Sequence, residues 1–195
     1  EDGWYAVVGI KGESRQQELV DNRDDFDAWV EHFLRQKKNV FFGVAKYKDD
    51  TTRAKHNVHA LRALWLDIDC GPGKDYPSQA EGLAALREFC GVVGLPRPIV
   101  VNSGRGWHVY WTLAQAVSRA EWEPVAAKLK EVCKNQGLLV DNACFEAARI
   151  LRVPGTFNFK GEEPLPVSVL STGKAIEYDD ICKLLGVGQR NVVVP

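Results

Sequence analysis

An α+β fold is predicted for this chain, with strands and helices following one another in a single domain. Apolar runs rich in β-branched and aromatic residues alternate with segments whose apolar residues recur every three or four positions, as in amphipathic helices. The 195 residues are 45% hydrophobic and 26% charged, which is the composition of a globular protein with a buried core. We find neither an internal repeat nor a clear linker, so we expect one domain over residues 1–195.

The first part of the chain is expected to hold three strands and one helix. Residues 4–10 form an apolar strand that ends in a Lys-Gly-Glu-Ser turn. Residues 22–38 space their aromatic and aliphatic side chains like one face of a helix. Residues 39–47 are predicted to be one buried strand, and the polar loop 48–58 leads into the next strand, residues 61–69.

The second part is expected to alternate helices with strands. Ser78 with Glu81, and Ser118 with Glu121, have the spacing of a capping box, so each pair is expected to open a helix. Pro124 leaves the first turn of the second of these helices uncertain. The other expected elements are the strands 98–103 and 107–113, joined as a hairpin, a short helical piece after Asp141, a strand near 167–170 and a helix near 178–185.

Composition excludes several classes of protein. The net charge of −1 argues against a surface that binds nucleic acid all over, so any such site must be a local basic patch. The five cysteines form no CxxC pair, which argues against a structural zinc site and a disulfide framework. No stretch approaches about 20 consecutive apolar residues and no signal peptide opens the chain, so we expect a cytoplasmic protein without a membrane partner.

Two carboxylates lie two residues apart at the end of the predicted strand 61–69. Because side chains alternate along a strand, Asp67 and Asp69 are expected on the same face. Their repulsion at neutral pH is costly unless a cation lies between them. Hard oxygen ligands of this kind suit Mg²⁺ or Mn²⁺ bridged to substrate phosphates. The alternative is a solvated strand end with ordinary surface acids.

A glycine-rich turn supplies the second polar signature, Ser103-Gly-Arg-Gly-Trp-His108. Gly104 and Gly106 permit positive φ and let backbone N–H groups approach an anion closely. Ser103 offers a hydroxyl donor and His108 an imidazole, a combination that suits the β- and γ-phosphates of a nucleotide. A metal-binding histidine and a buried core histidine are the alternatives for His108.

A third acid follows the apolar residues 138–140. Asp141 is therefore expected to close a strand and to offer a third oxygen ligand, with Glu146 as its rival. A basic loop comes next, in which Arg149, Arg152 and Lys160 could neutralise a triphosphate or contact a template phosphate. The alternative is a set of structural ion pairs with nearby glutamates.

Taken in order, these signatures resemble the archaeo-eukaryotic primase superfamily, and within it the primase–polymerase domains of phages and plasmids. The matching segments are residues 66–69, 103–111, Asp141 and 149–160, within a resemblance that spans residues 39–160. The resemblance implies an RRM-like catalytic sheet with helices, packed against a smaller N-terminal α/β unit. Many relatives carry a zinc-binding insertion, which this sequence lacks, so the resemblance implies no initiation role that depends on such a module.

The resemblance also implies roles for individual residues in template-directed nucleotidyl transfer by two metal ions. The implied catalytic and metal-binding acids are Asp67, Asp69 and Asp141, with Mg²⁺ or Mn²⁺ as the cofactor. The expected nucleotide-binding residues are Ser103, Gly104, Arg105, Gly106, His108, Arg152, Asn158 and Lys160. The candidate template-binding residues are Arg53, Lys55, His56 and Arg149.

The implied partners are a single-stranded or primed DNA template, a dNTP or NTP, and a helicase module. Both ends of the sequence resemble domain boundaries, so we expect residues 1–195 to be the N-terminal fragment of a longer primase–helicase, active in phage or plasmid replication in the host cytoplasm. Two other functions compete. A metal-dependent nuclease or phosphohydrolase would also cluster acids but would not need the triphosphate-binding turn and basic loop. An RRM-like nucleic-acid-binding module should expose aromatic residues on its sheet instead of paired acids.

Overall fold

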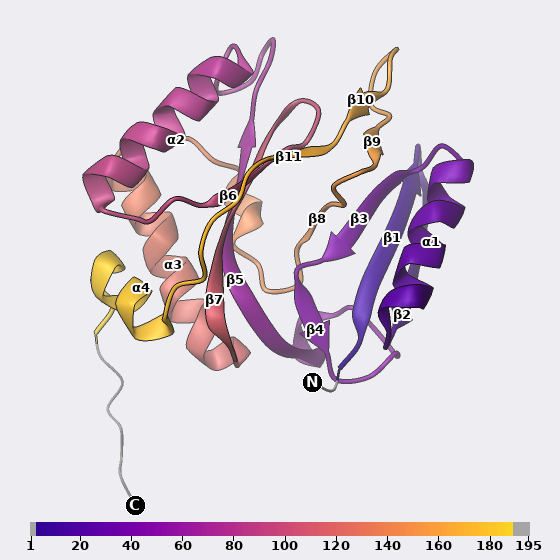
Figure 1. Cartoon of the computed structure of the whole chain (residues 1–195), viewed down its shortest axis with the longest axis horizontal. Helices are drawn as coiled ribbons and strands as arrows, with labels where there is room; N and C mark the ends of the chain where they lie inside the picture. Colours follow the sequence, from indigo (N-terminus) through magenta and orange to yellow (C-terminus); the bar gives the residue numbers. More distant parts are fainter. Residues whose placement is uncertain (1–2, 189–195) are drawn as a thin grey trace, which may run out of the picture.

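Two β-sheets face each other in the computed structural model, which describes residues 3–188 (Figure 1). The helices after residue 78 cover the outer side of the larger sheet, and the first helix of the chain covers the outer side of the smaller, N-terminal sheet (Figure 1). The predicted α+β class is therefore confirmed. Within residues 3–188 no helix is both long and apolar enough to cross a membrane.

The smaller sheet has the strand order β2-β1-β3-β8, and every neighbouring pair is antiparallel. Helix α1 packs on it through Phe33, which is fully buried against Val7 and Val40. The helix begins after Asn22, whose side chain accepts a hydrogen bond from the Asp25 N–H. The elements of this unit are β1 (Tyr5–Lys11), β2 (Ser14–Val20), α1 (Arg23–Arg35), β3 (Asn39–Gly43) and β8 (Ile150–Arg152).

Strand β2 was not predicted. It is mostly polar and exposed, so it carries no apolar alternation, and its pairing with β1 forms it.

The prediction of a single strand over residues 39–47 is wrong, because two strands lie there. The segment divides at Val44 into β3 and β4 (Ala45–Tyr47), which belong to different sheets. The Val44 N–H donates to the Arg149 carbonyl instead of joining a ladder. This segment consequently connects the two sheets.

The larger sheet has the order β11-β6-β7-β5-β4 and carries the central strand β5. β5 and β6 are both antiparallel to β7 and hence parallel to each other, and helix α2 connects them. The run β5–α2–β6–β7–α3 is the split βαβ arrangement of RRM-like sheets, so the expected architecture is confirmed. Its elements are β5 (Val58–Asp69), α2 (Gln79–Val93), β6 (Ile99–Asn102), β7 (Gly106–Val117), α3 (Arg119–Asn135), β11 (Ser168–Ser171) and α4 (Tyr178–Leu185).

Both predicted helix caps are present. The Ser78 hydroxyl accepts from the Glu81 N–H at the start of α2, and Ser118 with Glu121 forms a complete capping box on α3. Pro124 lies in the second turn of α3, so the helix begins before it. The remaining elements are two short 3₁₀ turns, η1 (Lys55–Asn57) and η2 (Asn142–Cys144), and the hairpin of β9 (Phe157–Asn158) with β10 (Leu165–Pro166).

We predict that Gly106→Ala destabilises the fold. Gly106 lies opposite Asp69 in the β5–β7 ladder, and a Cβ there would lie 2.2 Å from the Ile68 carbonyl oxygen. Overpacking of this kind should lower the free energy of unfolding by about 1–3 kcal/mol, measured by urea denaturation. The control is Gly91→Ala in α2, where a Cβ meets nothing within 4 Å and helix propensity favours alanine. Equal unfolding free energies for the two variants would contradict the prediction.

Candidate active site

A cleft of about 650 Å³ lies between the two sheets, at the end of β5 and beside the β6–β7 turn. The smaller sheet contributes Phe41 and Arg152 to its wall, and the larger sheet contributes Asp67 and His108. Cations outnumber carboxylates in the lining, although the whole chain has a net charge of −1. The cleft therefore suits a polyanion. Its charged residues are Asp67, Asp69, Lys74, Arg105, Arg149, Arg152 and Lys160.

Asp67 lies on β5 directly opposite His108 on β7. Its side chain is largely buried, with 18% of its surface exposed. Burial raises the pKa of the Asp67 carboxyl above its ordinary value, and the charges of Asp69 and Asp141 act in the same direction, while the Arg149 guanidinium opposes them. The charged form of Asp67 is therefore destabilised by burial unless a cation lies beside it.

Asp141 is held beside Asp67 by the backbone. The Asp141 N–H donates to the Asp67 carbonyl over 2.9 Å, and the Asp141 side chain accepts from the Ala143 N–H as the cap of η2. The expectation that Asp141 closes a strand is wrong. Residues 138–140 are apolar because Leu138 packs into the core just after α3, where its N–H bonds the Cys133 carbonyl, and they pair with no strand.

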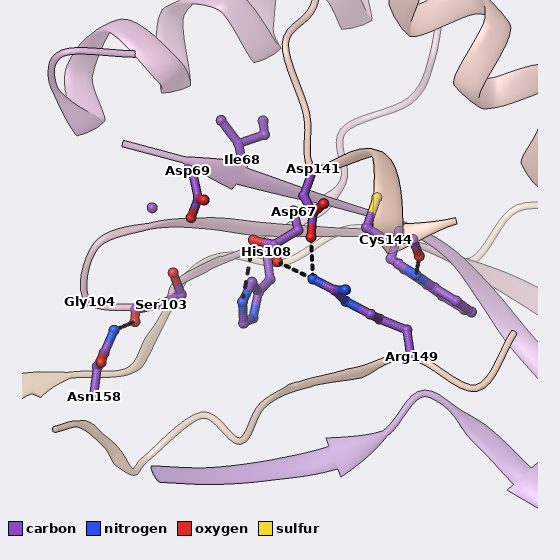
Figure 2. A network of polar contacts seen from close by, with 12 residues as sticks. Asp67, Ile68, Asp69, Ser103, Gly104, His108, Asp141, Cys144, Arg149 and Asn158 are labelled. Carbon is purple, nitrogen blue, oxygen red and sulfur yellow. Dashed lines mark hydrogen bonds and ion pairs between the residues drawn. The ribbon is translucent and has the colours of Figure 1, made fainter. Parts of the chain in front are cut away.

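Arg149 joins the two acids. Its Nη2 atom lies 3.0 Å from Oδ2 of Asp67 and also donates to Oδ2 of Asp141, as Figure 2 shows. Glu146, the rival third acid, is exposed and forms no ion pair with Arg149. The structure therefore places Asp141, and not Glu146, in an ion pair with Arg149, the same side chain that pairs with Asp67.

Asp69 lines the same cleft as Asp67, in agreement with the expected shared face. It forms an ion pair of 2.9 Å with Lys74, and both side chains are about half exposed. Sequence reasoning missed Lys74, which follows β5 in a loop and belongs to no recognisable pattern. A salt bridge between exposed groups contributes little to stability, so Asp69 is easily released from it.

The glycine turn differs from the expectation in one position. Gly104 has a φ of +89°, but Gly106 does not have a positive φ and is required instead by its close approach to β5. The Gly104 N–H is already bonded to the Asn102 side chain. Asn158 donates to the Ser103 carbonyl over 2.9 Å and packs on the turn. The Ser103 side chain lines the cleft, and its hydroxyl has no hydrogen bond to any residue within 3–188.

His108 is almost fully buried in the wall of the cleft. Burial, with the charges of Arg152 and Arg149, lowers its pKa to about 3, so the ring is neutral at physiological pH. Its Nε2 atom lies 3.8 Å from Oδ1 of Asp67, and its Nδ1 atom is buried without a hydrogen-bond partner in the described part of the chain. A satisfied core histidine would have a partner for that nitrogen.

Arg152 is a buried cation on the opposite wall. It donates to the Asn39 side chain over 2.7 Å and lies 4.7 Å from the centre of the Phe41 ring. Burial lowers its pKa to about 10, and no carboxylate within residues 3–188 forms an ion pair with it. Arg105 makes a different contact. Its guanidinium donates to the Lys160 carbonyl and so connects the β9–β10 loop to the glycine turn between β6 and β7.

Three of the four candidate template residues lie outside the cleft. Arg53 donates to the Ala148 carbonyl, Lys55 forms an ion pair of 3.2 Å with Glu123, and His56 is exposed in η1. Arg53 thereby supports the backbone next to Arg149. The template-binding role of these residues stays a prediction.

The acids of the cleft fit a divalent cation by their chemistry. Asp67, Asp69 and Asp141 are hard oxygen donors, and their mutual repulsion is part of what raises the pKa of Asp67. In the part of the chain that the structure describes, no three side chains of His, Cys, Asp or Glu are gathered so that they could hold a metal ion. Proteins commonly bind Mg²⁺ through one or two carboxylates together with substrate phosphates and water.

Comparisons with known proteins found one relative by sequence and several solved structures by fold. No family model matches the chain. A replication protein of Clostridium perfringens is 32% identical over 168 residues, which are 82% of this chain and 38% of that protein, so the match spans well under half of its length.

Solved structures with the same fold include the primase–polymerase AEP domain of cyanophage S-2L, with a TM-score of 0.70 and 17% identity over 94% of this chain and 89% of that one. The primase RepB′ has a TM-score of 0.64 and 11% identity over 95% of this chain and 57% of that one. Its catalytic domain in complex with initiator DNA has a TM-score of 0.61 and 12% identity over 95% and 86% of the two chains.

We predict that His108 makes the fold sensitive to acid. Its pKa is about 3 in the folded protein and about 6.5 in an unfolded chain, so between those values the unfolded state binds a proton that the folded state does not. Lowering the pH from 7 to 5 should therefore reduce the free energy of unfolding by about 2 kcal/mol through this residue. Urea denaturation at both pH values should show a smaller pH dependence for His108→Gln and His108→Asn. The same pH dependence in all three proteins would show that His108 is not buried as a neutral ring.

Proposed function

We propose that this chain, which has the fold of the archaeo-eukaryotic primase superfamily and its phage and plasmid primase–polymerase domains, is a template-directed nucleotidyltransferase. It would extend or start DNA strands from nucleoside triphosphates. The observation that carries this proposal is the cleft, where the largely buried Asp67 and the half-exposed Asp69 face the buried cation Arg152, which forms no ion pair with a carboxylate in the described chain.

The acid cluster would hold the metal ions. Asp67 and Asp69 at the end of β5, with Asp141 bonded to the β5 backbone, would supply the oxygen ligands for Mg²⁺ or Mn²⁺. When bound, such ions activate the attacking hydroxyl and stabilise the charge of the leaving pyrophosphate. The half-exposed Asp69 can exchange Lys74 for a metal ion at low cost.

The polar groups without partners would hold the triphosphate. Arg152 is a buried cation with unused donors, the Ser103 hydroxyl is free in the described chain, and the buried Nδ1 of His108 can bond a phosphate oxygen when protonated there as the neutral tautomer. Lys160 lies at the rim of the same cleft. Because Arg152, Ser103 and His108 are buried in the cleft wall before the substrate arrives, they contribute positioning and charge stabilisation to the reaction.

Two observations favour this function over its competitors. A nuclease or phosphohydrolase would need the acids but not a surplus of cations around them. An RRM-like binding module would present aromatic rings from its sheet, whereas the cleft face of β5 and β7 presents Asp67 and His108. Phe157, a strongly exposed aromatic residue, lies on β9 outside that sheet.

The surroundings of the reaction are part of the same proposal. A primed or single-stranded DNA template would be the partner, as the complex of the RepB′ catalytic domain with initiator DNA suggests by analogy. Residues 1–195 would form one catalytic domain of a longer chain with a helicase module, acting in phage or plasmid replication in the cytoplasm. The replication protein of Clostridium perfringens, which extends well beyond the matched region, supports the longer chain.

The first functional prediction concerns the two acids of β5. Asp67→Ala or Asp69→Ala should reduce primer extension with dNTPs and Mn²⁺ by about three orders of magnitude, because metal ions contribute several kcal/mol to such transition states. The matched control is Asp75→Ala, which removes an exposed acid of the loop after β5 that does not line the cleft. Extension near the wild-type rate by either strand variant would overturn the metal assignment.

The second functional prediction concerns His108. His108→Ala should weaken nucleotide binding by roughly one to two orders of magnitude, since a hydrogen bond to a charged group is worth about 1.5–3 kcal/mol. His108→Asn keeps a donor and should recover part of this loss. Titrations with a labelled nucleotide and, separately, a labelled primed template test it. Loss of template affinity with intact nucleotide affinity would reverse the assignment.

A further inference from the structure

The guanidinium of Arg149 contacts both Asp67, which is largely buried in the cleft wall, and Asp141 beside it, whose side chain is 32% exposed (Figure 2). One nitrogen, Nη2, serves both Oδ2 of Asp67 and Oδ2 of Asp141. Within residues 3–188, no other arginine or lysine lies within ion-pair distance of Asp67. Arg149 therefore supplies the positive charge that makes the burial of Asp67 tolerable.

This ion pair leaves most of the arginine's donors unused. Arginine binds a carboxylate most strongly through two parallel hydrogen bonds, but here a single nitrogen is shared by two acids. The Nε atom of Arg149 is buried and has no hydrogen-bond partner in the described chain. The side chain also lines the cleft and is 24% exposed. A guanidinium with free donors at the edge of a cleft can bind a second anion.

The backbone on either side of this side chain is fixed. The Arg149 carbonyl accepts from the Val44 N–H over 3.1 Å, and the Arg149 N–H donates to the Glu146 carbonyl over 3.0 Å. Arg53 donates to the carbonyl of Ala148. Any change of partner at Arg149 can consequently be confined to its long side chain, without movement of β8 or of Asp141.

We propose that Arg149 is a built-in counter-ion, which holds the place of a divalent cation between Asp67 and Asp141 and gives it up when that cation binds. The inference rests on the proposed function in assigning a divalent cation to these acids. The cation and the guanidinium need the same two oxygen atoms and repel each other, so they compete. The released guanidinium lies in the cleft, where its planar set of donors suits phosphate oxygens. Arg149 is thus a positioning residue that couples metal binding to triphosphate binding.

The test is the affinity for Mn²⁺ alone, measured without nucleotide by electron paramagnetic resonance of the free ion. Arg149→Gln should bind Mn²⁺ about tenfold more tightly than the wild type, within the range usual for coupling between two ligands. Arg149→Lys keeps the charge but not the shared geometry and should lie between the two. The matched control is Arg105→Gln, which removes the same charge from the same cleft but bonds the Lys160 carbonyl and no acid. Its Mn²⁺ affinity should stay within about threefold of the wild type.

A second readout is the melting temperature with and without Mn²⁺. In EDTA, Arg149→Gln should melt below the wild type because Asp67 and Asp141 lose their cation, and saturating Mn²⁺ should raise its melting temperature more than that of the wild type. Should Arg149→Gln fail to fold without metal, the Mn²⁺ titration of Arg149→Lys decides the matter by the same criterion of tighter binding than in the wild type.

The outcomes separate this inference from the proposed function. Equal or weaker Mn²⁺ binding by the Arg149 variants, with binding abolished in Asp67→Ala, would overturn the counter-ion role and leave the metal site in place. Absence of any Mn²⁺ binding that depends on Asp67, in the wild type and in both Arg149 variants, would overturn the counter-ion role. Absence of that binding also in the presence of a nucleotide would overturn the metal site.

Discussion

The burial of one carboxylate, that of Asp67, at the end of the central strand is the constraint on which the site depends. A buried charge is costly, and the pKa of Asp67 is raised for that reason. Two features around it reduce this cost or follow from it. Arg149 supplies an opposite charge, and the opposing His108 stays neutral. The chemistry of the cleft therefore depends on a buried carboxylate that needs a positive charge beside it, and not on a rigid metal cage.

The two-sheet architecture brings opposite charges to the same cleft. The acids end a strand of the larger sheet, whereas Arg152 is on β8, the edge strand of the smaller sheet, directly opposite Phe41. Because β3 and β4 are one continuous segment divided at Val44, the two sheets are joined beside the site. A substrate that carries both metal ions and negative charge would contact both sheets at once.

The comparisons and the site support the functional proposal in different ways. A TM-score of 0.70 at 17% identity shows a shared fold and says little about individual side chains. The residues of the cleft supply the chemical argument, through groups left without partners such as Nδ1 of His108 and Nε of Arg149. Unsatisfied buried nitrogen atoms are rare in folded proteins, and these two belong to side chains that line the cleft, so a ligand bound there could supply their partners.

Local patterns in the sequence were sufficient for much of the fold. The capping pairs at Ser78 and Ser118, the hairpin around Gly104 and the shared face of Asp67 and Asp69 depend on neighbours a few residues away, so they could be read from spacing alone. The polar strand β2 could not, because only its pairing with β1 forms it.

The tertiary structure decided which distant residues meet. Arg149 lies 82 positions from Asp67 in the sequence, and no periodic pattern links two such residues. Long-range packing also divides residues 39–47 between two sheets and places Asp141 on a turn. It likewise directs Arg53 to the Ala148 carbonyl, outside the cleft. The sequence by itself determined which chemical groups the site contains, namely the acids, the glycine turn and the basic loop. Their pairing was decided by the folded chain, because an ion pair depends on distance in space and burial, and neither is a property of spacing along the chain.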